Sequence, residues 1–110
     1  MDSSAACLRC GLRFAPEARR AGGISVLVTG DEVIYSYWRC GACGWYSIEE
    51  YYDAFLGDST VRWGPVVRPE IGDRALRWIA QCPDPHDKWC ECDAHRALAT
   101  GVPPWPDETN

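Results

Sequence analysis

The pattern of hydrophobic residues predicts a β-hairpin in the N-terminal half of the chain. Residues 24–28 and 33–38 are two short runs rich in β-branched and aromatic side chains, which favour strands. Residues 29–32 between them have the composition of a turn. We therefore expect two antiparallel strands joined by a short loop that contains Gly30.

The segment after this hairpin carries two competing signals. Residues 44–47 suit a third strand, but Ser47 followed by Glu50 resembles the capping box that begins many helices. Apolar side chains then recur at helical spacing before Gly57, at Ile48, Tyr51, Tyr52, Phe55 and Leu56. We predict a strand over 44–47 that runs into a helix over 48–56.

A longer helix is predicted in the C-terminal half. Residues 61–63 favour a short strand that ends at Gly64-Pro65. From Pro69 or Glu70 to Gln81, apolar side chains fall on one helical face, at Ile71, Ala75, Trp78, Ile79 and Cys82. This face is expected to cover one side of the sheet.

The last part of the chain is punctuated by proline. Pro83 and Pro85 end the long helix. A short helix is predicted over 94–100, with Asp93 as its N-cap and Gly101 after its last residue. Residues 102–110 contain three prolines, so we expect an extended tail there.

Length and charge narrow the possibilities. The 110 residues suffice for one domain, and 46% hydrophobic residues permit a core. A domain this small buries only about two-thirds of the surface that its unfolded chain exposes, so additional cross-links are useful. The net charge of −5 opposes binding to phosphate backbones, and we expect no nucleic-acid partner.

Cysteine usage points to metal. The first residues lack the apolar stretch of a signal peptide, and no apolar run is long enough to span a membrane. We therefore expect a soluble, cytoplasmic protein without a membrane partner. Thiols stay reduced in the cytosol, and an odd number of cysteines, seven, suits a disulfide framework poorly. The cysteines are predicted to be metal ligands.

Two CxxCG motifs give the clearest candidate site. They comprise Cys7 and Cys10 before Gly11, and Cys40 and Cys43 before Gly44. Two residues between cysteines allow a tight loop, or knuckle, whose sulfurs point at one ion, and the following glycine tolerates the required backbone geometry. Two knuckles brought together by the hairpin would supply four thiolates, which suits a closed structural Zn²⁺ site.

This double motif resembles the zinc-ribbon and rubredoxin-like group of metal-binding folds. Phe14 stands where an aromatic residue often follows the first knuckle, whereas Gly41 replaces the proline usual in rubredoxins. The resemblance implies a metal held by Cys7, Cys10, Cys40 and Cys43. It also implies an alternative in which iron occupies this site and the protein carries one electron.

A second cluster lies within residues 82–95. Its cysteines and its nearest histidine predict a Cys₃His zinc site made by Cys82, Cys90, Cys92 and His95, with His86 as an alternative ligand. Two other interpretations remain open. Cys82 could be a small buried hydrophobe, or the cluster could hold Cu(I) or zinc loosely and deliver it as a metallochaperone does.

Together these patterns predict an α+β protein with a zinc-ribbon-like, three-stranded antiparallel sheet, a covering helix and a C-terminal Cys/His metal segment. We expect a single domain over 1–110, divided into the ribbon (5–56), a linker and packing helix (57–81), the second cluster (82–101) and the tail. The expected function is that of an accessory or regulatory protein that binds a protein partner, with two structural zinc ions and no catalytic residues.

Overall fold

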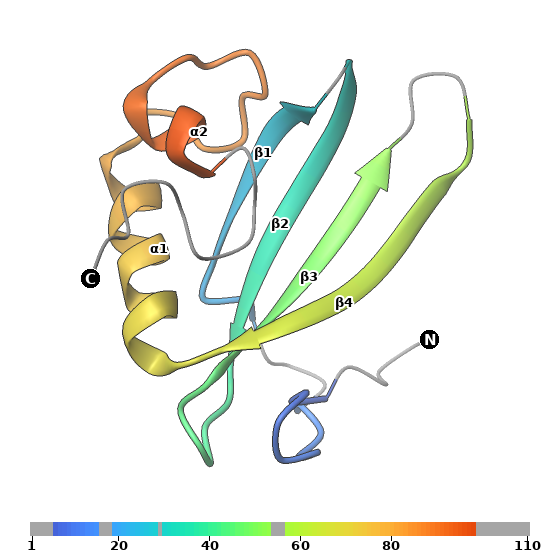
Figure 1. The fold of residues 1–110 in the computed structure, drawn as a ribbon, viewed down its shortest axis with the longest axis vertical. Helices are drawn as coiled ribbons and strands as arrows, with labels where there is room; N and C mark the ends of the chain where they lie inside the picture. The colour runs from blue at the N-terminus through green and yellow to red at the C-terminus, as the bar shows by residue number, and fades with distance from the viewer. Residues whose placement is uncertain (1–5, 16–18, 29, 54–56, 99–110) are drawn as a thin grey trace.

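Four antiparallel strands form one sheet, followed by two helices (Figure 1). The computed structural model describes residues 6–15, 19–28, 30–53 and 57–98. The strands β1 (Gly22–Val28), β2 (Asp31–Arg39), β3 (Tyr46–Asp53) and β4 (Ser59–Val67) lie side by side in chain order. The helices α1 (Pro69–Gln81) and α2 (Asp93–Leu98) contact β1, and the end of β4 leads directly into α1.

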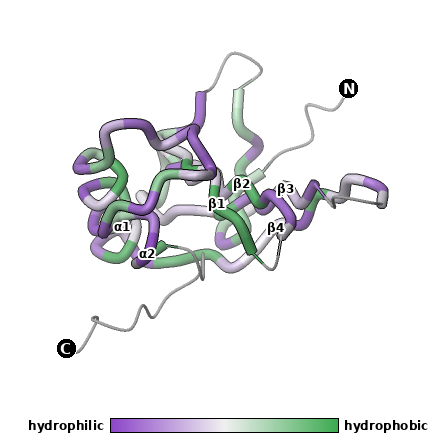
Figure 2. Tube along the Cα trace, turned by 90° about the horizontal axis from the view of Figure 1, so that it is seen from above, coloured by the Kyte–Doolittle hydropathy of each residue, from purple (hydrophilic) through white to green (hydrophobic). Residues whose placement is uncertain are grey.

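The core lies between α1 and one face of the sheet. Because side chains alternate along a strand, cross-strand partners share a face. The buried residues of this helix-facing side are Ile24, Val26, Val33, Tyr35, Tyr37, Tyr46, Ile48 and Val67. Helix α1 adds Ala75 and Ile79, and α2 adds Leu98. In Figure 2, seen from above, hydrophobic segments of β1 and β2 face the mixed turns of the two helices.

The predicted hairpin and the predicted long helix are both confirmed. Strands β1 and β2 contain residues 24–28 and 33–38 and extend a few residues beyond them. Helix α1 covers Pro69–Gln81, as its apolar periodicity predicted. The last helix begins at Asp93 itself, and its predicted end at 99–101 lies outside the described residues, as does the tail over 102–110.

The helix predicted over 48–56 is wrong for residues 48–53, and residues 54–56 lie outside the described part. Strand β3 pairs with β2 along its whole length, from Tyr46 opposite Arg39 to Asp53 opposite Glu32. Strand pairing therefore overrides the local helical spacing, and Tyr51 and Tyr52 fall on opposite faces. Ser47 is a buried strand residue instead of a helix cap.

The sheet has four strands where three were expected, because residues 57–68 are more than a linker. Strand β4 runs through Gly64-Pro65 to Val67 instead of ending there. The pairing with β3 slips between Ser47 and Glu49, so the Gly64-Pro65 pair is accommodated as a bulge. At a sheet edge proline does not break a ladder on both sides.

Among the described residues, no helix is long and apolar enough to cross a membrane.

Gly72 sets how closely α1 approaches the sheet. It is buried, and a Cβ atom built at this position would lie 1.9 Å from the ring of Tyr46. The Tyr46 hydroxyl donates a 2.6 Å hydrogen bond to Asp73 of the same helix, which fixes the ring against α1. Any side chain at position 72 must therefore move the helix or the ring.

We predict that Gly72→Ala lowers the free energy of unfolding by about 1–3 kcal/mol, since overpacking outweighs the better helix propensity of alanine. Denaturant unfolding measures the change. Gly41→Ala is the matched control, because nothing lies within 4 Å of a Cβ atom there and its stability should hardly change. Equal effects of both substitutions would contradict the close helix–sheet contact.

Candidate metal centres

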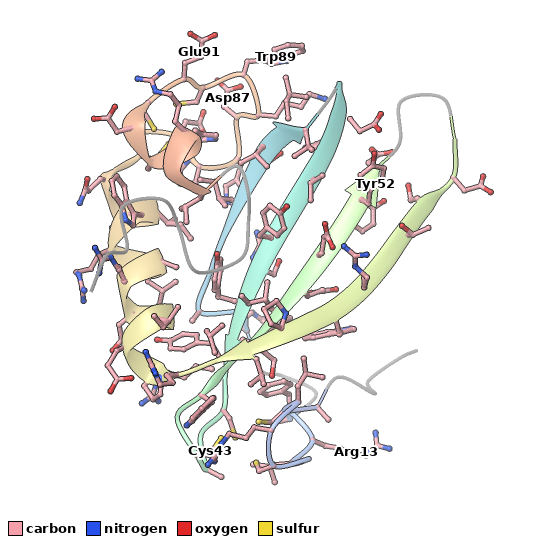
Figure 3. The ribbon with its side chains drawn as sticks, in the orientation of Figure 1. Arg13, Cys43, Tyr52, Asp87, Trp89 and Glu91 are labelled. Atoms are coloured by element: carbon pink, nitrogen blue, oxygen red, sulfur yellow. The ribbon has the colours of Figure 1, made fainter. Side chains whose placement is uncertain are left out.

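The first group of ligands lies at the end of the sheet where β1 begins and β2 ends. Cys7 and Cys10 precede β1, and Cys40 and Cys43 occupy the connection between β2 and β3. Because Gly22 pairs with Tyr37, the hairpin brings both segments to the same end. Figure 3 shows Cys43 there, below the strands and near other sulfur atoms.

The two knuckles have the same internal hydrogen bonds. The amide groups of Arg9 and Cys10 each donate to Cys7 Sγ at 3.4 Å. In the second knuckle, the amides of Ala42 and Cys43 donate to Cys40 Sγ at 3.4 and 3.5 Å. Such bonds stabilise negative charge on sulfur. Both loops therefore favour the thiolate form of their first cysteine.

Glycine closes each knuckle in the left-handed region. Gly11 has φ +82° and donates to the Cys7 carbonyl at 2.9 Å, and Gly44 has φ +80° and donates to the Cys40 carbonyl at the same distance. Side chains rarely adopt this backbone conformation. The glycine of each CxxCG motif is thus required by the turn.

The sulfur positions match a tetrahedron around zinc. Cys7 Sγ lies 3.7 Å from Cys43 Sγ, and Cys10 Sγ lies 3.6 Å from Cys40 Sγ. Four sulfurs at the Zn–S distance of about 2.3 Å lie roughly 3.8 Å apart in a regular tetrahedron. A disulfide would require about 2 Å. All four sulfurs lie within 4.8 Å of one another, so they could hold one ion.

Contacts outside the knuckles hold the first loop in place. The Leu8 amide donates to Ser47 Oγ at 3.0 Å, and Ser47 is fully buried in β3. The guanidinium of Arg9 lies 4.5 Å from the ring centroid of Trp45, just after the second knuckle. These two contacts join the first knuckle to the residues that follow the second knuckle, and they orient the cysteines.

The second group forms between the end of α1 and the start of α2. Cys82 is the C-cap residue of α1 and its amide donates to the Ile79 carbonyl. Turns closed by the amides of Asp87 and Cys90 follow, and His95 lies in the first turn of α2. Figure 3 shows this segment, with Asp87, Trp89 and Glu91, at the opposite end of the molecule from Cys43.

The ligand atoms of this group also converge. Cys82 Sγ lies 3.7 Å from Cys90 Sγ and 3.2 Å from His95 Nδ1, and Cys92 Sγ lies 3.5 Å from the same nitrogen. A regular tetrahedron with one nitrogen ligand has S···N edges of roughly 3.6 Å. The four ligand atoms lie within 4.8 Å of one another and could hold a second ion.

His95 has the protonation pattern of a metal ligand. Its Nε2 lies 3.0 Å from the carbonyl oxygen of Ser25, which can only accept, so Nε2 carries the proton. Nδ1 then presents its lone pair to Cys82 and Cys92. Metal-bound histidines usually donate their other ring N–H to such a partner. The side chain is only 4% exposed, so this orientation is fixed by burial.

Within each group, ionisation is favoured at one cysteine and opposed at a neighbouring one. Burial disfavours the Cys7 thiolate, but the amides of Cys10 and Arg9 outweigh this and lower its pKa to about 6. Burial raises the pKa of Cys82 to about 12, and the neighbouring thiols add to the increase. A divalent cation removes this conflict, because it favours the thiolate at every ligand.

The sequence and the structure group the same eight residues. Cys7, Cys10, Cys40 and Cys43 lie together, as do Cys82, Cys90, Cys92 and His95, while His86 is exposed and outside the second group. Sequence reasoning missed Ser25 and Ser47, which position the groups through hydrogen bonds. Neither carried a usable signal, because a serine in a strand does not indicate which distant segment it will meet.

A surface pocket of about 400 Å³ borders the second group. Its walls include the two ligands Cys90 and His95, and it is also lined by Val26, Leu27, Lys88, Trp89, Glu91 and Arg96. Trp89 is 69% exposed, and the Lys88 ammonium lies 5.9 Å from its ring centroid. This end of the molecule therefore presents a large apolar side chain beside a candidate metal centre.

Comparison of the chain with models of known protein families, with curated proteins and with solved structures finds no significant match. The functional assignment therefore depends on the geometry of the two ligand groups.

We predict that Cys40→Ser removes one bound ion and most of the folded structure, because the first group joins segments far apart in the sequence. Cys90→Ser should remove the other ion while the hairpin of β1 and β2 survives. Elemental analysis gives the metal content, and NMR amide dispersion reports the fold. Each variant serves as the control for the other. Unchanged metal content in both would show that these residues are not the ligands.

Proposed function

We propose that this chain is a small zinc protein that acts by binding a protein partner, and that its two metals are structural. The observation that carries this proposal is the closed donor set at each end of the sheet. Four protein ligands complete a tetrahedral zinc site, whereas catalytic zinc keeps a position for water or substrate. Zinc bound in this way stabilises the fold and supplies no chemistry.

The first centre has a second candidate role. Its paired knuckles with amide-to-sulfur hydrogen bonds would also suit iron in a rubredoxin-like electron carrier. We favour zinc because a Cys₄ set and a Cys₃His set are both donor sets that closed structural zinc sites use. Metal identity separates the two roles.

Metal content of the purified full chain tests the structural part of the proposal. We expect two zinc ions per chain, a colourless protein and slow exchange with a chelator. A red protein with iron at the first centre would support electron transfer instead. Copper at the second centre that exchanges readily would support a metallochaperone, and either result would overturn the assignment of two structural zinc ions.

Trp89 is our proposed contact residue for the partner. Exposed tryptophan is uncommon on free surfaces and enriched at the energetic centres of interfaces. Trp89 lies on the loop between Cys82 and Cys90 of the second group. The pocket beside it could accept a side chain of the partner. A partner bound here would depend on the second metal and much less on the first.

We predict that affinity capture with the tagged full chain retains a stoichiometric partner, and that Trp89→Ala loses it. Leu12→Ala is the matched control, because Leu12 is 50% exposed on the first knuckle loop, far from the second centre. Binding that survives Trp89→Ala, or is lost equally in Leu12→Ala, would contradict this surface. Both variants should keep the metal content of the unmodified chain.

A further inference from the structure

The two edges of the sheet differ in how they are covered. At β1, the Ser25 amide donates to the Pro85 carbonyl at 2.9 Å, and the Ser25 carbonyl accepts from His95. The segment of the second centre therefore covers that edge. Strand β4 pairs only with β3 within the part of the chain that the structure describes. Its outer backbone groups are open to pairing with another strand.

An apolar row reaches this open edge. Ile34 pairs with Tyr51, and Tyr51 pairs with Val61, so all three share the sheet face turned away from α1. Exposure rises toward the edge, since Ile34 is partly buried, Tyr51 is 36% exposed and Val61 is 51% exposed. The most exposed member of the row thus lies on the strand that has room for a neighbour.

We propose that β4 is a self-association surface, on which a second copy of this chain pairs its own β4 antiparallel, with Val61 opposite Val61 on the twofold axis. In this register Ser59 faces Trp63 and Thr60 faces Arg62 of the second copy. The apolar row then continues across the axis, and the two sheets become one. Isologous pairing of this kind needs a self-complementary segment.

Charge favours this register for pairing between two copies. Arg62 is the only charged residue in β4, and its Nε and Nη2 atoms donate to Glu50 Oε1 at 2.9 and 2.5 Å. Its charge is therefore compensated on its own sheet. Centring the pair on Val61 places Arg62 opposite Thr60, whereas centring it on Arg62 would place like charges directly opposite, which is destabilising.

The length of the ladder limits its strength. Pro65 lacks an amide hydrogen, so pairing extends over residues 59–63 and ends before the bulge. A hollow of about 330 Å³, lined by Glu50, Tyr52, Thr60, Val61 and Arg62, lies over β3 and β4, mostly on the side opposite the apolar row. A ladder of this size gives a dimer that depends on protein concentration.

This inference goes beyond the proposed function and does not depend on it, because β4 contacts neither ligand group. Analytical ultracentrifugation of the metal-loaded full chain, over a wide range of concentration, is the test. We expect a monomer–dimer equilibrium, and Val61→Lys should raise the dimer Kd by about tenfold or more, since it places two ammonium groups on the axis. Leu12→Lys, at a similarly exposed leucine elsewhere, should leave Kd unchanged.

Hydrogen exchange on the unmodified chain keeps the test independent of how Val61→Lys folds. Amides of residues 59–63 should become more protected as protein concentration rises, while those of β1 should not change. A protein that stays monomeric at every concentration would overturn the proposal. So would a dimer whose Kd is unchanged by Val61→Lys and whose β4 amides gain no protection as it forms. Both measurements use the metal-loaded chain, so failure to find a protein partner would not affect either outcome.

Discussion

Convergence of thiolates and one imidazole on two points is the constraint on which this structure depends. Without a cation, burial raises the pKa of Cys82, and the neighbouring thiols of Cys92 and Cys90 raise it further. A divalent ion turns the same proximity into attraction and couples metal binding to folding. The proposed zinc ions thereby supply cross-links that a small core needs.

The two centres have complementary positions on the sheet. The first ties the segment before β1 to the connection between β2 and β3, and Ser47 anchors it from within β3. The second ties the end of α1 to the start of α2 and reaches the β1 edge through His95. An ion bound at the first group would therefore fix an end of the sheet, and one bound at the second would fix the helices against its edge. Helix α1, held close to Tyr46 by Gly72, connects them.

The sequence was most informative where spacing alone determines structure. The hairpin follows from two runs of β-branched and aromatic residues around a turn, and α1 follows from the periodicity of its apolar residues. The CxxCG motifs indicate which cysteines lie together. The part of β3 after residue 47 was not predicted, because the spacing of Tyr51 and Tyr52 is compatible with a helix as well as with a strand. Pairing with β2 decided between them. Likewise, Gly64-Pro65 predicts the end of a strand from the local sequence alone. In the structure the pair lies inside β4, because an edge strand with a bulge accommodates it. His95 was predicted as the nitrogen ligand, but the contact of its ring with the Ser25 carbonyl could not be predicted, because the two residues lie far apart in the sequence.

X-ray absorption at the zinc edge, measured on the purified full chain, tests the central claim most directly. Two closed centres of the kind described require four sulfur ligands at one ion and three sulfurs with one nitrogen at the other, with Zn–S distances of about 2.3 Å. Oxygen ligands from water or carboxylate, or a chain that folds with its cysteines oxidised and no metal bound, would contradict it.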